Sequence, residues 1–183
     1  MGSSYSERLF RTVIDYSESN LWDNAVQEWV IEDCEEDNSL KESCICGKEK
    51  LKYLYTIRNE YNGNTLFPIG SSCIKKFGRD DLNYAISVQE GMFKLLHAIQ
   101  DQAFINLSSE FFSRKLLQYL YDEGAFDNHF NHFNGENDFD FFTQMFNKRD
   151  KDSISSAQHR KIRAIIVSSI KPFLEERLRD RVD

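Results

Sequence analysis

Four cysteines are the residues of this sequence with the clearest capacity for chemistry. They are Cys34, Cys44, Cys46 and Cys73, and they all fall within a stretch of forty residues. Structural zinc sites use four thiolate or imidazole ligands arranged as a tetrahedron, and the thiols lose their protons on binding. The four cysteines supply a complete ligand set of this kind. We therefore expect one structural zinc ion bound by all four.

Two other interpretations of the cysteines stay open at this stage, namely reduced thiols packed in the core and disulfide bonds. Disulfides persist mainly in oxidising compartments. The sequence has no apolar run of the roughly 18 residues that a membrane span requires, and its start lacks the apolar core of a signal peptide. We therefore expect a cytoplasmic protein with no membrane contact, where zinc is favoured over disulfides.

The segments around the cysteines indicate how the sulfur atoms would converge. Cys44-Ile45-Cys46-Gly47 is similar to a zinc knuckle, in which glycine lets backbone amides turn toward the sulfurs. Residues 51–59 and 65–69 alternate in polarity around the turn signal Asn62-Gly63-Asn64, which predicts a β-hairpin. Cys73 falls at the start of a short predicted helix, where the helix dipole favours thiolate. Knuckle, hairpin and helix predict a treble-clef-like unit, although the one-residue knuckle spacing and the single helix ligand depart from the usual pattern.

The remaining elements are predicted to be mainly helical. A helix over about 5–18 and a strand over 26–34 precede the cysteine-rich segment. Because Pro68 cannot donate to a ladder, the second hairpin strand is an edge strand or ends there. A helix is expected from Asp80 to about residue 98, followed by apolar stripes in 111–121, 139–146 and 154–170, and Pro172 breaks or restarts the last helix. The fold class is therefore α+β: a small treble-clef-like β-hairpin zinc unit (residues 1–79) packed on a mainly helical body (residues 80–183).

Charge is distributed unevenly along a chain whose net charge is −7. Residues 1–43 contain eleven acidic and three basic residues, whereas residues 148–163 contain six basic and two acidic ones. The net charge argues against a protein that coats nucleic acid through bulk electrostatics. Two charged segments are candidate partner-binding surfaces. The acidic candidates are Glu35, Glu36 and Asp37, and the basic candidates are Lys148, Arg149, Arg160, Lys161 and Arg163.

The pair His129 and His132, with Asp127 and Asp138 nearby, is a further candidate for chemistry. Such residues can hold a hydrolytic metal ion, but a polar loop with solvated histidines is the simpler interpretation. The sequence shows no glycine-rich phosphate loop, no G-x-S-x-G motif and no cysteine outside the zinc set that would act as a nucleophile. The sequence therefore assigns no catalytic residue and favours a binding protein over an enzyme.

Four short segments carry a resemblance to known proteins: Cys44-Ile45-Cys46-Gly47-Lys48, Tyr55-Thr56-Ile57-Arg58-Asn59, Gly63-Asn64, and the run from Pro68 to Phe77. Through them, residues 26–79 resemble a family of small proteins encoded on phages and mobile elements of Gram-positive bacteria. Residues 146–166 resemble phage accessory proteins more loosely. The resemblance implies a zinc site, and proteins of this kind and length include anti-CRISPR proteins that act on type II-A Cas9.

Two functions from different classes follow as expectations. In the first, the chain is an anti-CRISPR protein that binds Cas9 or its complex with guide RNA and inhibits it. In the second, the zinc unit makes the chain a nucleic-acid-binding accessory protein in phage recombination or replication. A nuclease built around His129 and His132 is a third possibility, and it requires metal-dependent cleavage by the protein alone.

Overall fold

The computed structural model describes residues 4–101 and 107–182 and divides them between two compact units. Unit 1 comprises residues 1–89 and 180–183, and unit 2 comprises residues 90–179. Helix α4 (Asp80–Gln100) begins in unit 1 and continues in unit 2. The sequence predicts the division one element earlier, before this helix. The difference arises because α4 contributes buried side chains to both units, with Leu82 and Ile86 before the boundary and Phe93 and Leu96 after it.

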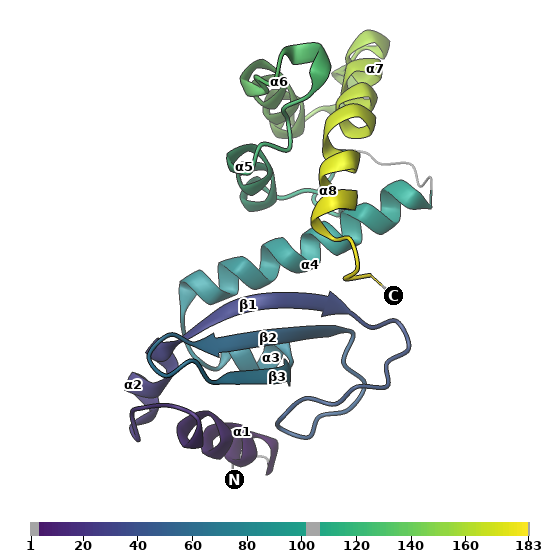
Figure 1. The fold of residues 1–183 in the computed structure, drawn as a ribbon. Helices are drawn as coiled ribbons and strands as arrows, with labels where there is room; N and C mark the ends of the chain where they lie inside the picture. Colours follow the sequence, from purple (N-terminus) through teal and green to yellow (C-terminus); the bar gives the residue numbers. More distant parts are fainter. Residues whose placement is uncertain (1–3, 102–106, 183) are drawn as a thin grey trace. The chain divides into compact units, whose positions relative to one another are not determined.

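Unit 1 is built around a three-stranded antiparallel sheet with the order β1-β2-β3 (Figure 1). Its strands are β1 (Trp29–Glu36), β2 (Tyr53–Asn59) and β3 (Thr65–Ile69). Cys34 of β1 pairs with Tyr55 of β2, which pairs with Ile69 of β3. The predicted hairpin is confirmed, and so is the edge position of the strand that contains Pro68. The first strand starts later than expected because residues 26–28 form a helical turn.

The helices of unit 1 are short and bury one side each. They are α1 (Ser4–Asp15), α2 (Trp22–Ala25), the 3-10 turn η1 (Val26–Glu28) and α3 (Ser71–Lys75). Helix α1 buries Leu9 and Val13 completely, at the helical spacing that predicts it. Because α3 follows β3 with only Gly70 between them, the edge strand fixes the position of its first turn.

A buried carboxylate ties the start of the sheet to the loop after α1. Glu28 is 2% exposed, and its carboxylate oxygens accept hydrogen bonds from the backbone of Glu18 (2.7 Å) and Ser19 (2.8 Å) and from the Asn59 side chain (2.6 Å). Burial by itself raises the pKa of Glu28, but these three donors together outweigh it and lower the pKa below its ordinary value. The ionised form of Glu28 is therefore the one that stabilises the fold.

Replacing Glu28 with glutamine tests this contact. A carboxyl whose pKa is lowered by folding stabilises the protein above its ordinary pKa, and this contribution disappears as the pH falls through the lowered value. We expect E28Q to reduce the free energy of unfolding at neutral pH by about 1–3 kcal/mol, because one of the three donors loses its acceptor. Urea unfolding should show this deficit shrinking below about pH 4. The exposed Glu18→Gln is the matched control, and equal effects of the two variants at neutral pH would contradict the assignment.

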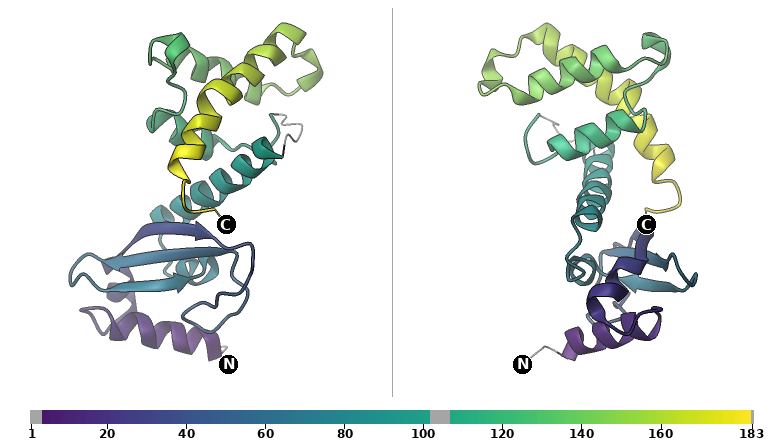
Figure 2. Two further views of the ribbon diagram at one scale, coloured as in Figure 1. Left: turned by 45° about the vertical axis from the view of Figure 1, so that its right-hand side comes forward. Right: turned by 90° about the vertical axis from the view of Figure 1, so that its left-hand side faces the viewer.

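Unit 2 is helical (Figure 2). Its elements are α5 (Arg114–Asp122), the 3-10 turn η2 (His129–Asn131), α6 (Glu136–Asn147), the 3-10 turn η3 (Lys151–Ser153), α7 (Ser156–Ile165), the π-helical segment η4 (Ile166–Ile170) and α8 (Lys171–Arg177). The three predicted apolar stripes fall in α5, in α6 and in α7 with η4, and each contributes buried side chains. Aromatic rings contact α6 from α5 and from the segment before it. Tyr121 of α5 stacks on Phe139 at 4.3 Å, and Phe112, which precedes α5, is in edge contact with Phe142 at 5.2 Å.

Pro172 restarts the last helix without ending the helical path. Proline has no backbone N–H, so it leaves the carbonyl of Ser168 without its usual partner four residues later. The chain widens into the π-helical segment just before this point, and α8 then begins with Pro172 in its first turn. This is the restart that the sequence predicts.

Gly135, at the start of α6, packs directly on the backbone of Phe126. A Cβ atom built on Gly135 would lie 2.5 Å from the carbonyl carbon of Phe126 and 2.6 Å from its Cβ. Backbone atoms cannot move aside as a flexible side chain does. Glycine is therefore required at this position by close approach, since its φ of −84° is an ordinary value for any residue.

The contrast with Gly91 makes this contact testable. We expect Gly135→Ala to lower the free energy of unfolding by about 2–3 kcal/mol, as overpacking does. In Gly91→Ala the new Cβ meets only a flexible leucine methyl at 3.4 Å within helix α4, so that variant should be neutral or gain up to about 1 kcal/mol. Thermal melts of the two variants and the unmodified protein measure this difference. A G135A variant as stable as the unmodified protein would contradict the close packing of Gly135 on Phe126.

Candidate metal centre

The knuckle segment, Cys44 to Lys48, is a tight turn that hydrogen-bonds to the edge strand of the sheet. The backbone N–H of Cys44 donates to the carbonyl of Lys48 (2.8 Å), and that of Gly47 donates to the carbonyl of Cys44 (2.7 Å). Gly47 has φ +95°, a conformation that favours glycine and that the knuckle pattern predicts. Between the two cysteines, the N–H of Ile45 donates to the carbonyl of Pro68 on β3 (2.9 Å). The edge strand thus positions both knuckle cysteines.

Cys73 reaches the same place from the helix that follows β3. It is the third residue of α3, and its N–H donates to the carbonyl of Gly70, which precedes the helix (3.0 Å). The N–H of Gly70 itself donates to the Sγ atom of Cys44 (3.3 Å). Strand β3 is therefore flanked by the knuckle along its edge and by a helix start at its end, and the cysteines of both point to one position.

The three sulfur atoms form one buried cluster. The Sγ atoms of Cys44, Cys46 and Cys73 all lie within 4.8 Å of one another, and those of Cys44 and Cys73 are 3.6 Å apart. The exposed fractions of the three residues are 4%, 1% and 5%. Within residues 4–101 and 107–182, this is the only group of three or more Cys, His, Asp or Glu side chains with ligand atoms this close.

The local environment favours a thiolate at Cys44. Its pKa is lowered to about 5, first because the Cys73 thiol donates to its sulfur and further because the backbone N–H groups of Cys46 and Gly70 point at it. The pKa of Cys73 is raised, because its proton is the one shared with Cys44 and because it is buried. A bound metal ion would reverse the direction at Cys73, since a coordinated thiol is deprotonated.

The cluster passes a geometric test for a metal site. Tetrahedral ligands about 2.3 Å from a metal ion are about 3.8 Å from each other, which is close to the separation of the Cys44 and Cys73 sulfurs. Three thiols within 4.8 Å of one another, with an N–H directed at one sulfur, are a donor set that soft and borderline metal ions prefer. Cys44, Cys46 and Cys73 can therefore hold a metal ion.

Cys34 is not part of the group of sulfurs within 4.8 Å of one another, so the structure brings together three of the four predicted ligands. Its thiol is buried on β1, where it makes a long contact with the carbonyl of Glu35 (3.9 Å). The cluster lies on the β3 side of the sheet, and β1 and β3 are separated by β2. Spacing along the sequence could not show which side of the sheet Cys34 would occupy.

The acidic candidates do not form one exposed surface. Glu35 is exposed, but Glu36 and Asp37 are only 4% and 8% exposed. The pKa of Asp37 is lowered, first by the hydroxyl of Ser39 and also by backbone N–H groups, including those of Ser39 and Lys41. Asp37 therefore builds the turn after β1. This corrects the expectation that all three acids are free to contact a partner.

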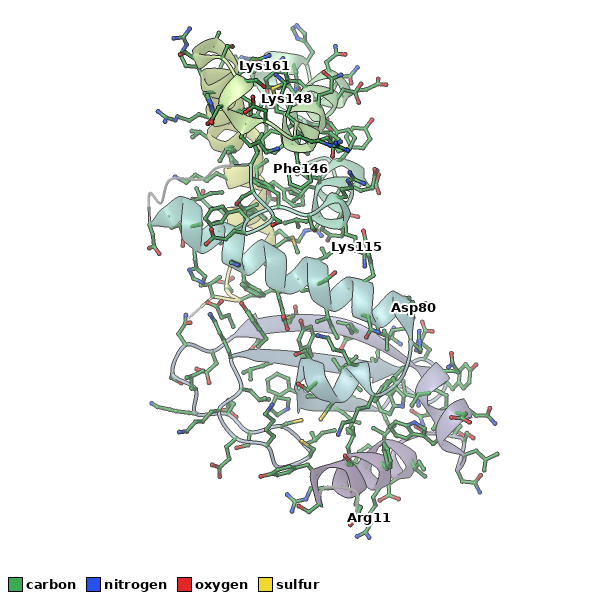
Figure 3. All side chains as sticks on the ribbon, turned by 180° about the vertical axis from the view of Figure 1, so that it is seen from behind. Arg11, Asp80, Lys115, Phe146, Lys148 and Lys161 are labelled. Carbon is green, nitrogen blue, oxygen red and sulfur yellow. The ribbon has the colours of Figure 1, made fainter. Side chains whose placement is uncertain are left out.

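The basic candidates are more accessible. Arg149, Arg160 and Arg163 are exposed, and Lys148 is half-buried after the end of α6. Lys161 is exposed but already has partners within unit 2, because its ammonium group lies 3.6 Å from the Asp138 carboxylate and 4.4 Å from the centre of the Phe141 ring. Figure 3 labels Lys148 and Lys161 in unit 2. The freely available positive charge is therefore mainly on the arginines.

His129 and His132 are exposed on a short polar loop. Neither belongs to the metal-competent cluster of the described residues. Asp138, which the sequence places beside them, instead accepts a hydrogen bond from Asn131 (3.0 Å) and pairs with Lys161. The structure thus supports the polar-loop interpretation of this segment.

Comparison with known proteins adds no relative to this description: no family model, no curated protein and no solved structure matches the chain. In the described residues, none of the helices combines the length and the apolar character needed to cross a bilayer.

Single cysteine replacements separate the three-sulfur cluster from Cys34. We expect the protein purified without chelator to carry about one metal ion per chain, and Cys44→Ser, Cys46→Ser or Cys73→Ser to lose most of it. Because metal binding free energy is also folding free energy, these variants should lose roughly 3 kcal/mol or more of stability. Cys34→Ser is the matched control and should keep its metal. Elemental analysis that finds C34S as depleted as C46S would contradict the three-cysteine site.

Proposed function

We propose that Cys44, Cys46 and Cys73 bind a single zinc ion, and that this ion is structural. The observation that carries the proposal is the burial of all three sulfurs at the point where the knuckle, the β2–β3 hairpin and helix α3 meet. Zinc is the common metal for such thiolate sets, and the arrangement is treble-clef-like. A tetrahedral zinc ion has four ligands, and these three cysteines leave its fourth coordination position to another group. The proposal that the ion is structural therefore rests on the burial of the three sulfurs.

We further propose that the chain acts by binding, as an inhibitor of a CRISPR-Cas9 effector complex. The resemblance of residues 26–79 to proteins of Gram-positive phages supports this function. Its electrostatic basis is the acidity of unit 1, which contains seventeen acidic and eleven basic residues. A nuclease that holds RNA and DNA presents positive surfaces, which an acidic protein can occupy. Such a role places the chain in the bacterial cytoplasm.

Ion pairs within unit 1 show which acidic side chains already have a partner and which remain for contact with Cas9. On β1, Glu32 pairs with Arg58 (3.3 Å) and Asp33 pairs with Arg181 (2.6 Å). Glu35, Glu42 and Glu49 are exposed in or beside the long loop between β1 and β2. We therefore assign the acidic contact surface to Glu35, Glu42 and Glu49 in place of Glu36 and Asp37.

A second candidate function is nucleic-acid binding. The observation in its favour is the exposure of Arg160 and Arg163 on α7 and of Arg149 near the end of α6. Guanidinium groups on one helix can contact phosphates, and such binding weakens steeply with salt. The two functions differ in what the isolated chain binds.

A cleavage assay with several type II-A Cas9 enzymes tests the proposal. We expect the unmodified protein to inhibit DNA cleavage, and the triple variant Glu35→Lys, Glu42→Lys and Glu49→Lys to weaken inhibition about tenfold or more at physiological salt. The matched variant Arg160→Glu with Arg163→Glu should leave inhibition within about threefold. No inhibition of any of these enzymes would refute the function. A salt-sensitive gel shift of nucleic acid by the isolated chain, lost in the arginine variant, would favour the second candidate.

A further inference from the structure

Two phenylalanines of unit 2 stand out because they project into solvent. Phe130 is 80% exposed and Phe133 is 72% exposed, the two highest values among the large apolar side chains of the described residues. They lie three residues apart on the segment 128–134, which we call the Phe loop. Isolated apolar residues on a surface are ordinary, but two aromatic rings presented together are typical of binding sites.

Hydrogen bonds hold the Phe loop in one conformation. The side-chain oxygen of Asn128 accepts from the N–H groups of Phe130 (2.7 Å) and Asn131 (3.0 Å), and that of Asn131 accepts from the N–H of Asn128 (2.9 Å). Asn128 also donates to Ser169 (2.6 Å). Asn131 and the backbone N–H of Phe133 add bonds to the Phe126 and Asn128 carbonyls. The rings are therefore carried on a backbone that is already ordered, so binding would cost little additional conformational entropy.

The backbone at the tip of the loop is also unusual. His132 and Phe133 have φ values of +56° and +60°, the left-handed region that residues other than glycine rarely adopt. Two such residues in succession persist only when the surrounding contacts fix them. The conformation brings Phe133 back toward Asn128, whose carbonyl accepts the Phe133 N–H at 2.9 Å.

The charges around the Phe loop determine which partner fits it. The flanking residues Asp127, Glu136, Asp138 and Asp140 bring four carboxylates, and Lys161 pairs with one of them, Asp138. Asp127 and Asp138 are engaged within unit 2, through Gly135 and through Asn131 and Lys161 respectively. Glu136 and Asp140 are exposed on the first turns of α6. Phosphate groups would be repelled here, whereas cationic side chains would be attracted.

We propose that the Phe loop is a docking site for a basic, arginine-bearing segment of a partner protein. Arginine fits both features, because its planar guanidinium group stacks on an aromatic face and also forms charged hydrogen bonds to carboxylates. Phe130 and Phe133 supply the apolar contact, and Glu136 and Asp140 supply the charge. This inference rests on the proposed role of the chain as a binding protein, and it adds a second contact surface to the acidic surface of unit 1.

The test uses the full chain and a fluorescein-labelled peptide of about twelve residues that alternates arginine with leucine. Fluorescence anisotropy should give a micromolar dissociation constant, and Phe130→Ala with Phe133→Ala should raise it about tenfold or more. Phe67→Ala, which removes a 47%-exposed phenylalanine from β3, is the matched control and should change it less than twofold. Glu136→Gln with Asp140→Asn should raise it about threefold and reduce its salt dependence, whereas Glu110→Gln should not.

The acidic surface of unit 1 could itself attract the basic peptide, and the phenylalanine variants distinguish this attraction from docking at the Phe loop. Purely electrostatic attraction of the peptide to the chain would survive the loss of both rings, so a change below twofold in F130A/F133A would overturn the proposal. Tighter binding of a twenty-nucleotide oligo-dT with the same ring dependence would overturn it in favour of base stacking. Self-association that disappears in F130A/F133A would overturn it in favour of a second copy of this chain.

A second measurement guards against misfolding of the double variant. In protein labelled with 4-fluorophenylalanine, the fluorine signals of positions 130 and 133 should shift on peptide addition, and unchanged signals would contradict docking at the loop. Peptide binding in a protein that fails to inhibit Cas9 would leave this inference standing and remove the proposed function. Inhibition of Cas9 by a chain that does not bind the peptide would support the proposed function and overturn this inference.

Discussion

The central contact of unit 1 is the convergence of three buried thiols beside the edge strand. The sheet has only three strands, α3 is five residues long, and the loop between β1 and β2 contains no regular element. Elements this short are not stable by themselves in water, so they depend on tertiary contacts. The three cysteines join the loop, the edge strand and α3 at one point. Without a bound metal ion, the three thiols would stabilise the fold only by burying their small apolar surface.

Buried polar contacts add to the apolar core of unit 1. Glu28 fixes the loop after α1 to the start of the sheet, and Asp37 shapes the turn after β1. Both are carboxylates turned inward to backbone N–H groups, so part of the acidity that is visible in the sequence is structural. The charge that remains at the surface of unit 1 is smaller and more localised than the composition suggests.

Local patterns in the sequence predicted most elements of the fold. Alternation of polarity and the Asn-Gly turn predicted the β2–β3 hairpin, and the helical spacing of Leu9 and Val13 predicted α1. Patterns that depend on neighbours distant in sequence were less informative. Cys34 was assigned to the metal site because it completed a ligand count, yet β2 separates its strand from the cluster. The burial of Glu36 and Asp37 depends in the same way on tertiary contacts, such as the Asp37 N–H bond to Lys52.

X-ray absorption spectroscopy at the zinc edge of the purified chain tests the central claim most directly. The account predicts three sulfur scatterers at about 2.3 Å and one lighter oxygen or nitrogen scatterer at about 2.0 Å. Four sulfur scatterers would show that Cys34 joins the site and that the separation by β2 is wrong. A spectrum with no sulfur in the first shell would contradict the thiolate centre itself.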